Sequence, residues 1–200
     1  MTTSGPQALS VTITVPAPAD AVFAVLADPA RHATIDGTGW VCGPLDGERL
    51  TTSGQVFRMG MYHPNHPDGR YEIANQVREL DPPRAISCEP GTEDAEGRLS
   101  FGGWIWRYDL APAADGDTEV RLTYDWSGAT AEAREVIEFP PFGVEHLMHP
   151  PREPRPHRRG DRDPGHRAVA RHRGDAPDPV DAVALVVGIP IRCRRQDPHL

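Results

Sequence analysis

Aromatic and sulfur-containing side chains recur at strand spacing in this sequence, and these residue types can hold a flat apolar ligand. In residues 104–110 and 120–126 a bulky apolar residue stands at every second position, which predicts two strands with one apolar, largely aromatic face each. Indole and phenol rings combine a large contact area with one polar tip, and methionine adapts to the shape of a ligand. The predicted ligand-binding residues are Phe57, Met59, Met61, Trp104, Trp106, Tyr108, Tyr124 and Trp126. An ordinary hydrophobic core is the alternative interpretation of the same residues.

No catalytic constellation is recognisable, so the catalytic residues stay unknown. The sequence contains neither a glycine-rich phosphate-binding motif after a strand nor an evident Ser-His-Asp or Cys-His arrangement. His63 and His66 have a spacing that suits a metal, but no third ligand follows at a sensible spacing, so no metal and no cofactor are expected. Glu72 is the strand carboxylate best placed for a further role, although a solvated strand face is the simpler interpretation.

The elements that must position these side chains form an α+β order. Residues 9–15 alternate between apolar and polar and predict a half-buried strand, while 19–27 carry apolar residues at helical spacing and 30–35 suit one more helical turn. Further strands are predicted at 40–42, 55–62, 70–80, 85–89, 104–110 and 120–126, with an acidic loop at 93–97 and a short helical or irregular piece at 130–138. The Gly/Asp-rich turn at 113–117 joins the last two strands into a hairpin.

Composition excludes several classes of partner. The formal net charge of −8 argues against a nucleic acid or an anionic membrane as the partner of the whole chain. Cys42, Cys88 and Cys193 are isolated, which favours a reducing, cytoplasmic setting. No stretch approaches the roughly 20 apolar residues of a membrane span, and no secretion signal is visible at the N-terminus.

The charge pattern breaks near Leu147. Residues 1–147 carry 10 Arg against 22 acidic residues, whereas 148–200 carry 11 Arg against 7 acidic residues together with 9 of the 22 prolines. Three segments are therefore predicted: a flexible N-terminus at 1–8, one domain at 9–147, and an Arg/Pro/His-rich tail at 148–200.

The domain resembles the START-like, or SRPBCC, superfamily in its polyketide cyclase/dehydrase branch. The resemblance is carried by VTITVPAPADAVFAVLADPARHATID, FRMGMYHPNHPDGRYEIANQVRELDPPRAISCEP, GWIWRYDLAP, TEVRLTYDWSG and FPPFGVEHL, which together cover most of residues 9–147. It implies a helix-grip fold, in which a curved antiparallel sheet of about seven strands, with short N-terminal helices, wraps around a long C-terminal helix. A cavity between the sheet and that helix holds hydrophobic molecules in this family.

The sequence departs from this pattern where the long helix is due. Prolines at 150, 151, 154 and 156 are incompatible with a continuous helix, so the helix is predicted to be missing or disrupted. One back-translation of residues 149–158, read one nucleotide later, encodes an amphipathic Thr-Leu-Arg-Glu-Asn-Leu-Ala-His-Ile-Ala. A frameshift near Leu147 or Met148 is therefore one hypothesis, a genuine disordered basic tail is the other, and resequencing of the gene separates them.

Three functional hypotheses remain open from the sequence. The first is a binding module for a hydrophobic, lipid- or polyketide-like small molecule, of unknown oligomeric state. The second is a polyketide cyclase/dehydrase-type enzyme acting on a ligand in the same cavity. The third is a truncated and poorly functional family member. A buried carboxylate or histidine facing the cavity would favour the enzyme, and a wholly apolar cavity would favour the carrier.

Overall fold

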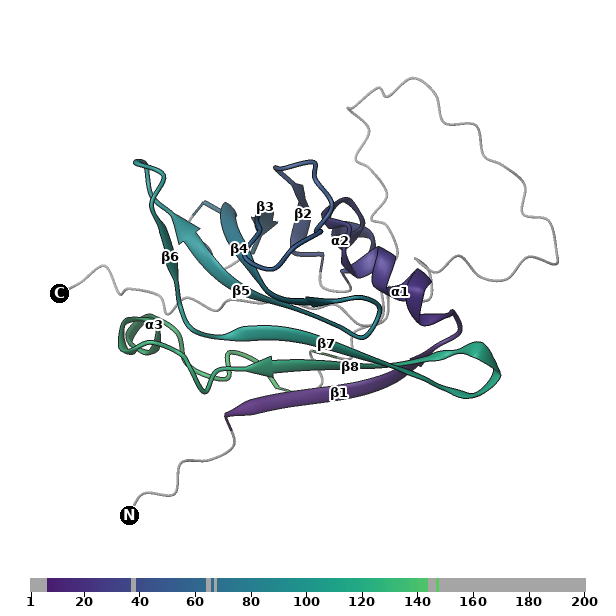
Figure 1. The fold of residues 1–200 in the computed structure, drawn as a ribbon. Coiled ribbons are helices and arrows are strands. Elements are labelled where there is room, and N and C mark those ends of the chain that lie inside the picture. Colours follow the sequence, from purple (N-terminus) through teal and green to yellow (C-terminus); the bar gives the residue numbers. More distant parts are fainter. Residues whose placement is uncertain (1–6, 37–38, 64–65, 67, 144–146, 148–200) are drawn as a thin grey trace, which may run out of the picture.

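One strongly curved antiparallel sheet dominates the computed structural model, which describes residues 7–36, 39–63, 66, 68–143 and 147 (Figure 1). The strands are β1 (Ala8–Val15), β2 (Val41–Pro44), β3 (Val56–Tyr62), β4 (Arg70–Asp81), β5 (Ala85–Glu93), β6 (Leu99–Phe101), β7 (Ile105–Pro112) and β8 (Thr118–Asp125). The helices are α1 (Ala19–Leu26), α2 (Pro29–Ile35) and α3 (Ala131–Val136), with a 3-10 turn at Ala114–Gly116. This is the α+β, helix-grip class that the sequence predicts.

The sheet order is β1-β8-β7-β5-β4-β3-β2, and β6 pairs with β5 beside this path. Figure 1 shows α1 and α2 at one end of the curved sheet and α3 at the opposite end. The predicted tail at 148–200, its boundary with the domain and the loss of the long C-terminal helix all lie outside the described residues.

The predicted aromatic hairpin is confirmed by β7 and β8. Trp106 pairs with Tyr124 and Tyr108 with Leu122, and the buried positions alternate along both strands. In the connecting turn Asp115 has φ +60° and Gly116 has φ +86°. The turn residues therefore allow the chain to reverse within a few positions and keep the aromatic residues of both strands on one face.

The sequence prediction missed the far end of β5 and the whole of β6. Pro90 and Gly91 suggest a strand end, but β5 continues through them to Glu93, and Gly91 pairs with Phe101 of β6. A Cβ atom at Gly91 would lie 2.4 Å from the Ser100 carbonyl oxygen. Gly91 thus marks a close approach of two backbones rather than a break in the strand.

The inner face of the sheet carries the core. Trp106, Tyr124 and Leu122 are almost fully buried there, and the chain after α3 packs on the two aromatic rings. The Phe142 ring stacks on Trp106 with centroids 5.8 Å apart and lies 5.0 Å from Tyr124, while Phe139 lies 5.6 Å from Trp104. Residues 139–142 and the buried Leu147 therefore close part of the concave face.

A histidine connects the two N-terminal helices. His32 in α2 donates from Nε2 to the Leu26 carbonyl oxygen at the end of α1, over 2.9 Å. Its ring also meets the Phe57 ring edge-on, with centroids 5.9 Å apart. Burial lowers the pKa of His32, and this effect outweighs the opposing effects of the Leu26 carbonyl and the Asp28 charge.

We expect acidification to destabilise the protein through His32. Because the folded-state pKa is lowered, the unfolded chain binds this proton more tightly. The stabilisation is complete above the unfolded pKa of about 6.5 and is lost as the pH falls below it, by up to about 1.4 kcal/mol per pH unit. Urea denaturation at pH 7.5 and 5.5 should show a smaller pH dependence for His32→Gln than for the wild type. His66→Gln is the control, and an unchanged pH dependence in His32→Gln would contradict the assignment.

Candidate functional site

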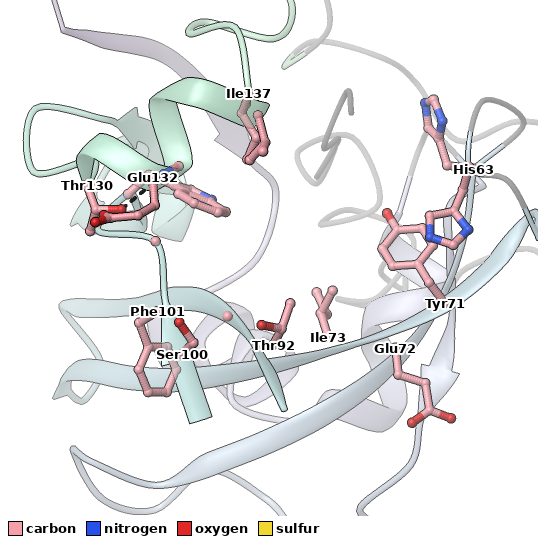
Figure 2. Close-up of a pocket in the computed structure, with 16 residues that line it drawn as sticks. His63, Tyr71, Glu72, Ile73, Thr92, Ser100, Phe101, Thr130, Glu132 and Ile137 are labelled. Atoms are coloured by element: carbon pink, nitrogen blue, oxygen red, sulfur yellow. Dashed lines mark hydrogen bonds between the residues drawn. The ribbon is translucent and has the colours of Figure 1, made fainter. Parts of the chain in front are cut away.

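A cavity of about 480 Å³ lies between α3 and the β4, β5 and β6 part of the sheet (Figure 2). Cavities of roughly 300–1,000 Å³ are the usual size for small organic ligands. Its apolar and aromatic wall is formed by Tyr71, Ile73, Phe101, Trp104, Ala133, Val136 and Ile137, together with Gly91 and Gly102. The polar residues at its edge are His63, His66, Glu72, Thr92, Ser100, Thr130 and Glu132.

A buried carboxylate positions the turn that carries the Trp104 wall. The Gly103 amide donates to Glu89 Oε1 over 2.8 Å, and Arg78 Nε donates to Glu89 Oε2 over 2.6 Å. Glu89 is only 6% exposed, so these charge-assisted hydrogen bonds compensate the loss of hydration of its carboxylate. Gly102 provides the space for the Trp104 ring, because a Cβ atom there would lie 1.7 Å from a ring carbon.

Side-chain and backbone bonds place α3 on the opposite side of the cavity. The Thr130 amide donates to the Gly102 carbonyl over 2.9 Å, and the Thr130 hydroxyl accepts from the Ala133 amide over 3.1 Å as a helix cap. From the next turn, Arg134 Nη2 donates to the Trp126 carbonyl over 2.7 Å. These bonds connect α3 to both the β6–β7 turn and the end of β8, which holds Ala133 against the cavity.

Two histidines that lie between β3 and β4 in the sequence, His63 and His66, pack against aromatic rings at the cavity. His63 is 5% exposed and meets Trp40 edge-on at 4.4 Å, and His66 stacks on Tyr71 at 4.7 Å. Among the described residues, no group of three or more His, Cys, Asp and Glu side chains is arranged to hold a metal. Figure 2 shows Glu72 on the side of β4 away from Tyr71, as strand alternation requires, and the residue is exposed.

A second, smaller cavity of about 40 Å³ lies deeper under the sheet. Ile73 lines both cavities. The apolar part of the small cavity comprises Leu26, Val41, Leu50, Phe57, Met59, Met61, Ile73, Ile86 and Trp106. Besides the indole N–H of Trp106, the residues there with a polar or ionisable side-chain group are His32, Asn75, Ser87, Cys88 and Tyr108.

The ionisable groups of the small cavity are held neutral. Burial raises the pKa of the Cys88 thiol to about 12, and it raises the pKa of the Tyr108 phenol well above its ordinary value. The lowered pKa of His32 keeps that imidazole uncharged at neutral pH. The small cavity is therefore a neutral environment that suits uncharged groups.

The structure distributes the eight predicted ligand-binding residues over three surroundings. Trp104 alone lines the large cavity. The small cavity is lined by Phe57, Met59, Met61, Trp106 and Tyr108. Tyr124 and Trp126 line neither cavity and pack within the aromatic core. All eight are buried on the inner side, and their contact with a ligand stays a prediction.

Most of the large cavity's wall escaped the sequence prediction. Phe101 and Ser100 lie on β6, which was not predicted, and Ala133, Val136 and Ile137 belong to a short segment predicted only as helical or irregular. Tyr71 and Ile73 were identified as strand residues but not as cavity residues. The imperfect alternation of β4 was the available signal, because this strand forms the floor of both cavities.

One protein family and two curated relatives match the sequence of this chain. The family described as polyketide cyclase/dehydrase and lipid transport matches residues 6–145. Two uncharacterised proteins of Mycobacterium tuberculosis, from strains CDC 1551 and H37Rv, are 30% and 29% identical over 128 residues. Each alignment covers 64% of this chain and 51% of the relative, so the chain spans about half the length of the curated relatives it matches.

Solved structures with a similar chain path come from several bacteria. A protein from Arthrobacter aurescens has a TM-score of 0.49 at 17% identity, with 64% of this chain and 73% of that chain covered. A protein from Chromobacterium violaceum has a TM-score of 0.48 at 20% identity, with 68% and 85% covered. A Mycobacterium smegmatis protein has a TM-score of 0.48 at 20% identity, with 64% and 76% covered.

The described part of the chain contains no helix long and apolar enough to cross a membrane.

The resemblance to the SRPBCC superfamily is confirmed by the family match, which covers well over half of the 200 residues. The chain therefore belongs to the polyketide cyclase/dehydrase and lipid transport family.

Proposed function

We propose that this protein binds a hydrophobic, lipid- or polyketide-like small molecule in the cavity of about 480 Å³. The observation that carries the proposal is the wall of this cavity, in which aromatic and aliphatic side chains from β4, β6, α3 and the β6–β7 turn converge. Burial of apolar ligand surface against such a wall drives binding. The domain at 9–147 is the binding unit, and the free thiols Cys42 and Cys88 accord with a reducing, cytoplasmic setting.

Blocking the cavity at Ala133 is expected to weaken binding of the dye 1-anilinonaphthalene-8-sulfonate at least tenfold. Ala133 is 7% exposed on the cavity side of α3, so the ring in Ala133→Phe takes up ligand space. Ala131→Phe, on the exposed side of the same helix, is the matched control and should bind the dye as the wild type does. Dye titration by fluorescence, with far-UV circular dichroism to verify folding, measures both. Equal dye affinity in all three proteins would contradict the proposal.

A cyclase/dehydrase-type activity in the same cavity is the second candidate, and His63 is the observation that favours it. An imidazole that is 5% exposed at the wall of an apolar cavity can act as a general acid or base on a bound carbonyl compound. Incubation with a synthetic aryl β-triketone should then yield a cyclised product that has lost one water, detected by mass spectrometry. His63→Gln should retain dye binding and lose this product, and an unchanged triketone would contradict the activity.

A further inference from the structure

Two residues that line the small cavity carry a buried polar atom without a hydrogen-bond partner among the described residues. These are the Oδ1 atom of Asn75 and the Nε1 atom of Trp106, in side chains that belong to residues only 2% and 1% exposed. Both residues line the cavity of about 40 Å³. One atom is an acceptor and the other a donor, so the cavity wall offers an unmet pair of hydrogen-bonding groups.

Buried polar groups without partners are rare in folded proteins, because each has lost its bonds to water. One water molecule occupies roughly 10–15 Å³ of such a volume, so about 40 Å³ is enough for a polar ligand group. A hydroxyl group both donates and accepts, so a single hydroxyl has the bonding capacity to serve an acceptor such as Asn75 Oδ1 and a donor such as Trp106 Nε1. A methyl group satisfies neither atom, and an ether or ketone oxygen satisfies only the indole N–H.

The surroundings favour an uncharged group over a carboxylate. His32, Cys88 and Tyr108, the ionisable side chains at the small cavity, are all held neutral by burial, as described above. An ionised ligand group would thus enter a low-dielectric site without a charged partner, which is costly.

The two cavities follow each other along one strand. Tyr71, Ile73 and Asn75 are alternate residues on the inner face of β4, with Tyr71 at the large cavity, Asn75 at the small one and Ile73 at both. Four residues of a strand span about 13 Å. A ligand that reached from Tyr71 to Asn75 along β4 would therefore extend over about this length, with its body beside Tyr71, Phe101 and Trp104.

We propose that the ligand is a flat aromatic molecule with a neutral hydroxyl at its buried end, and that this hydroxyl donates to Asn75 and accepts from Trp106 in the small cavity. This inference rests on the proposed binding function and adds the chemical class of the ligand to it. The aromatic side chains of the large cavity match a planar body, and the Asn75–Trp106 pair selects its phenolic end.

The test compares four naphthalenes of matched shape in isothermal titrations with the full chain. We expect 2-naphthol to bind about 10-fold more tightly than 2-methylnaphthalene, with 2-methoxynaphthalene between them and 2-naphthoate weaker than 2-naphthol. Affinities are compared after correction for the partition of each compound into octanol. If the protein binds 2-naphthol no more tightly than 2-methylnaphthalene, the inference is overturned, because the small cavity then holds water or remains empty.

Asn75→Leu removes the acceptor at nearly constant volume, and it should reduce the preference for 2-naphthol over 2-methylnaphthalene about fivefold or more. Gln76→Leu is the matched control, because the neighbouring amide is half-buried on the other face of β4 and bonds to Gly54; it should keep the preference. A preference unaltered by Asn75→Leu overturns the assignment of this residue.

A second measurement needs no variant and covers the case in which Asn75→Leu fails to fold. The Trp106 indole N–H resonance should move downfield when 2-naphthol is added and stay in place with 2-methylnaphthalene. If the wild-type protein binds none of the four naphthalenes and does not bind the dye, the proposed function itself is refuted. Dye binding without a hydroxyl preference refutes only the present inference.

Discussion

Replacement of Trp106 by alanine is expected to lower the free energy of unfolding by about 3–5 kcal/mol. Trp106 is 1% exposed near the start of β7, and the centroid of its ring lies 4.6 Å from that of Tyr124 and 5.8 Å from that of Phe142. Removal of the indole loses its transfer free energy and leaves a hole that rigid neighbouring strands cannot fill. Since folded domains are stable by only about 5–15 kcal/mol, this is a large fraction of the total.

Urea denaturation followed by far-UV circular dichroism measures this loss, which corresponds to a fall in Tm on the order of 10 °C. Trp106→Phe keeps most of the ring contacts, so its free energy of unfolding should fall clearly less than that of Trp106→Ala. Leu45→Ala, at a side chain 50% exposed, is the surface control and should change stability by about 0.5 kcal/mol or less. A Trp106→Ala protein within 1 kcal/mol of the wild type would show that this side chain is not the centre of the core.

Replacement of Gly103 by alanine is expected to destabilise the protein by about 2–4 kcal/mol and to weaken dye binding as well. Gly103 has φ +84°, and a Cβ atom there would lie 2.1 Å from the Gly128 carbonyl oxygen. The Gly128 carbonyl belongs to the backbone, so it cannot move aside as the end of a flexible side chain can. The β6–β7 turn must therefore shift, which strains the Gly103–Glu89 bond and displaces the adjacent Trp104 from the cavity wall.

Gly116→Ala separates the two causes of the lost stability in Gly103→Ala, which are the left-handed backbone conformation and the contact of the added Cβ atom with Gly128. Gly116 has nearly the same φ, +86°, but nothing lies within 4 Å of an added Cβ atom. Its substitution should cost only the left-handed backbone conformation, about 1–2 kcal/mol, and leave dye affinity unchanged. Equal effects of both substitutions on stability and on dye binding would mean that the contact with Gly128 does not constrain the turn.

Local patterns in the sequence determined much of the framework. The alternation in residues 9–15, 104–110 and 120–126 predicts β1, β7 and β8 and the face that each buries, because side chains in a strand have a period of two. The apolar spacing in 19–27 predicts α1 in the same way. These patterns are local, so they can be recognised without knowledge of what packs against them.

Only the tertiary structure decided which inward residues face a cavity and which face other side chains. Trp104 and Trp126 have the same residue type and the same strand spacing, yet Trp104 lines the large cavity and Trp126 lies in the core. Trp104 shares its cavity with residues of β6 and α3, whereas Trp126 packs on the Tyr124 ring with centroids 5.5 Å apart. Periodicity assigns a residue to a face of a strand, whereas the contents of the space opposite that face depend on segments distant in the sequence.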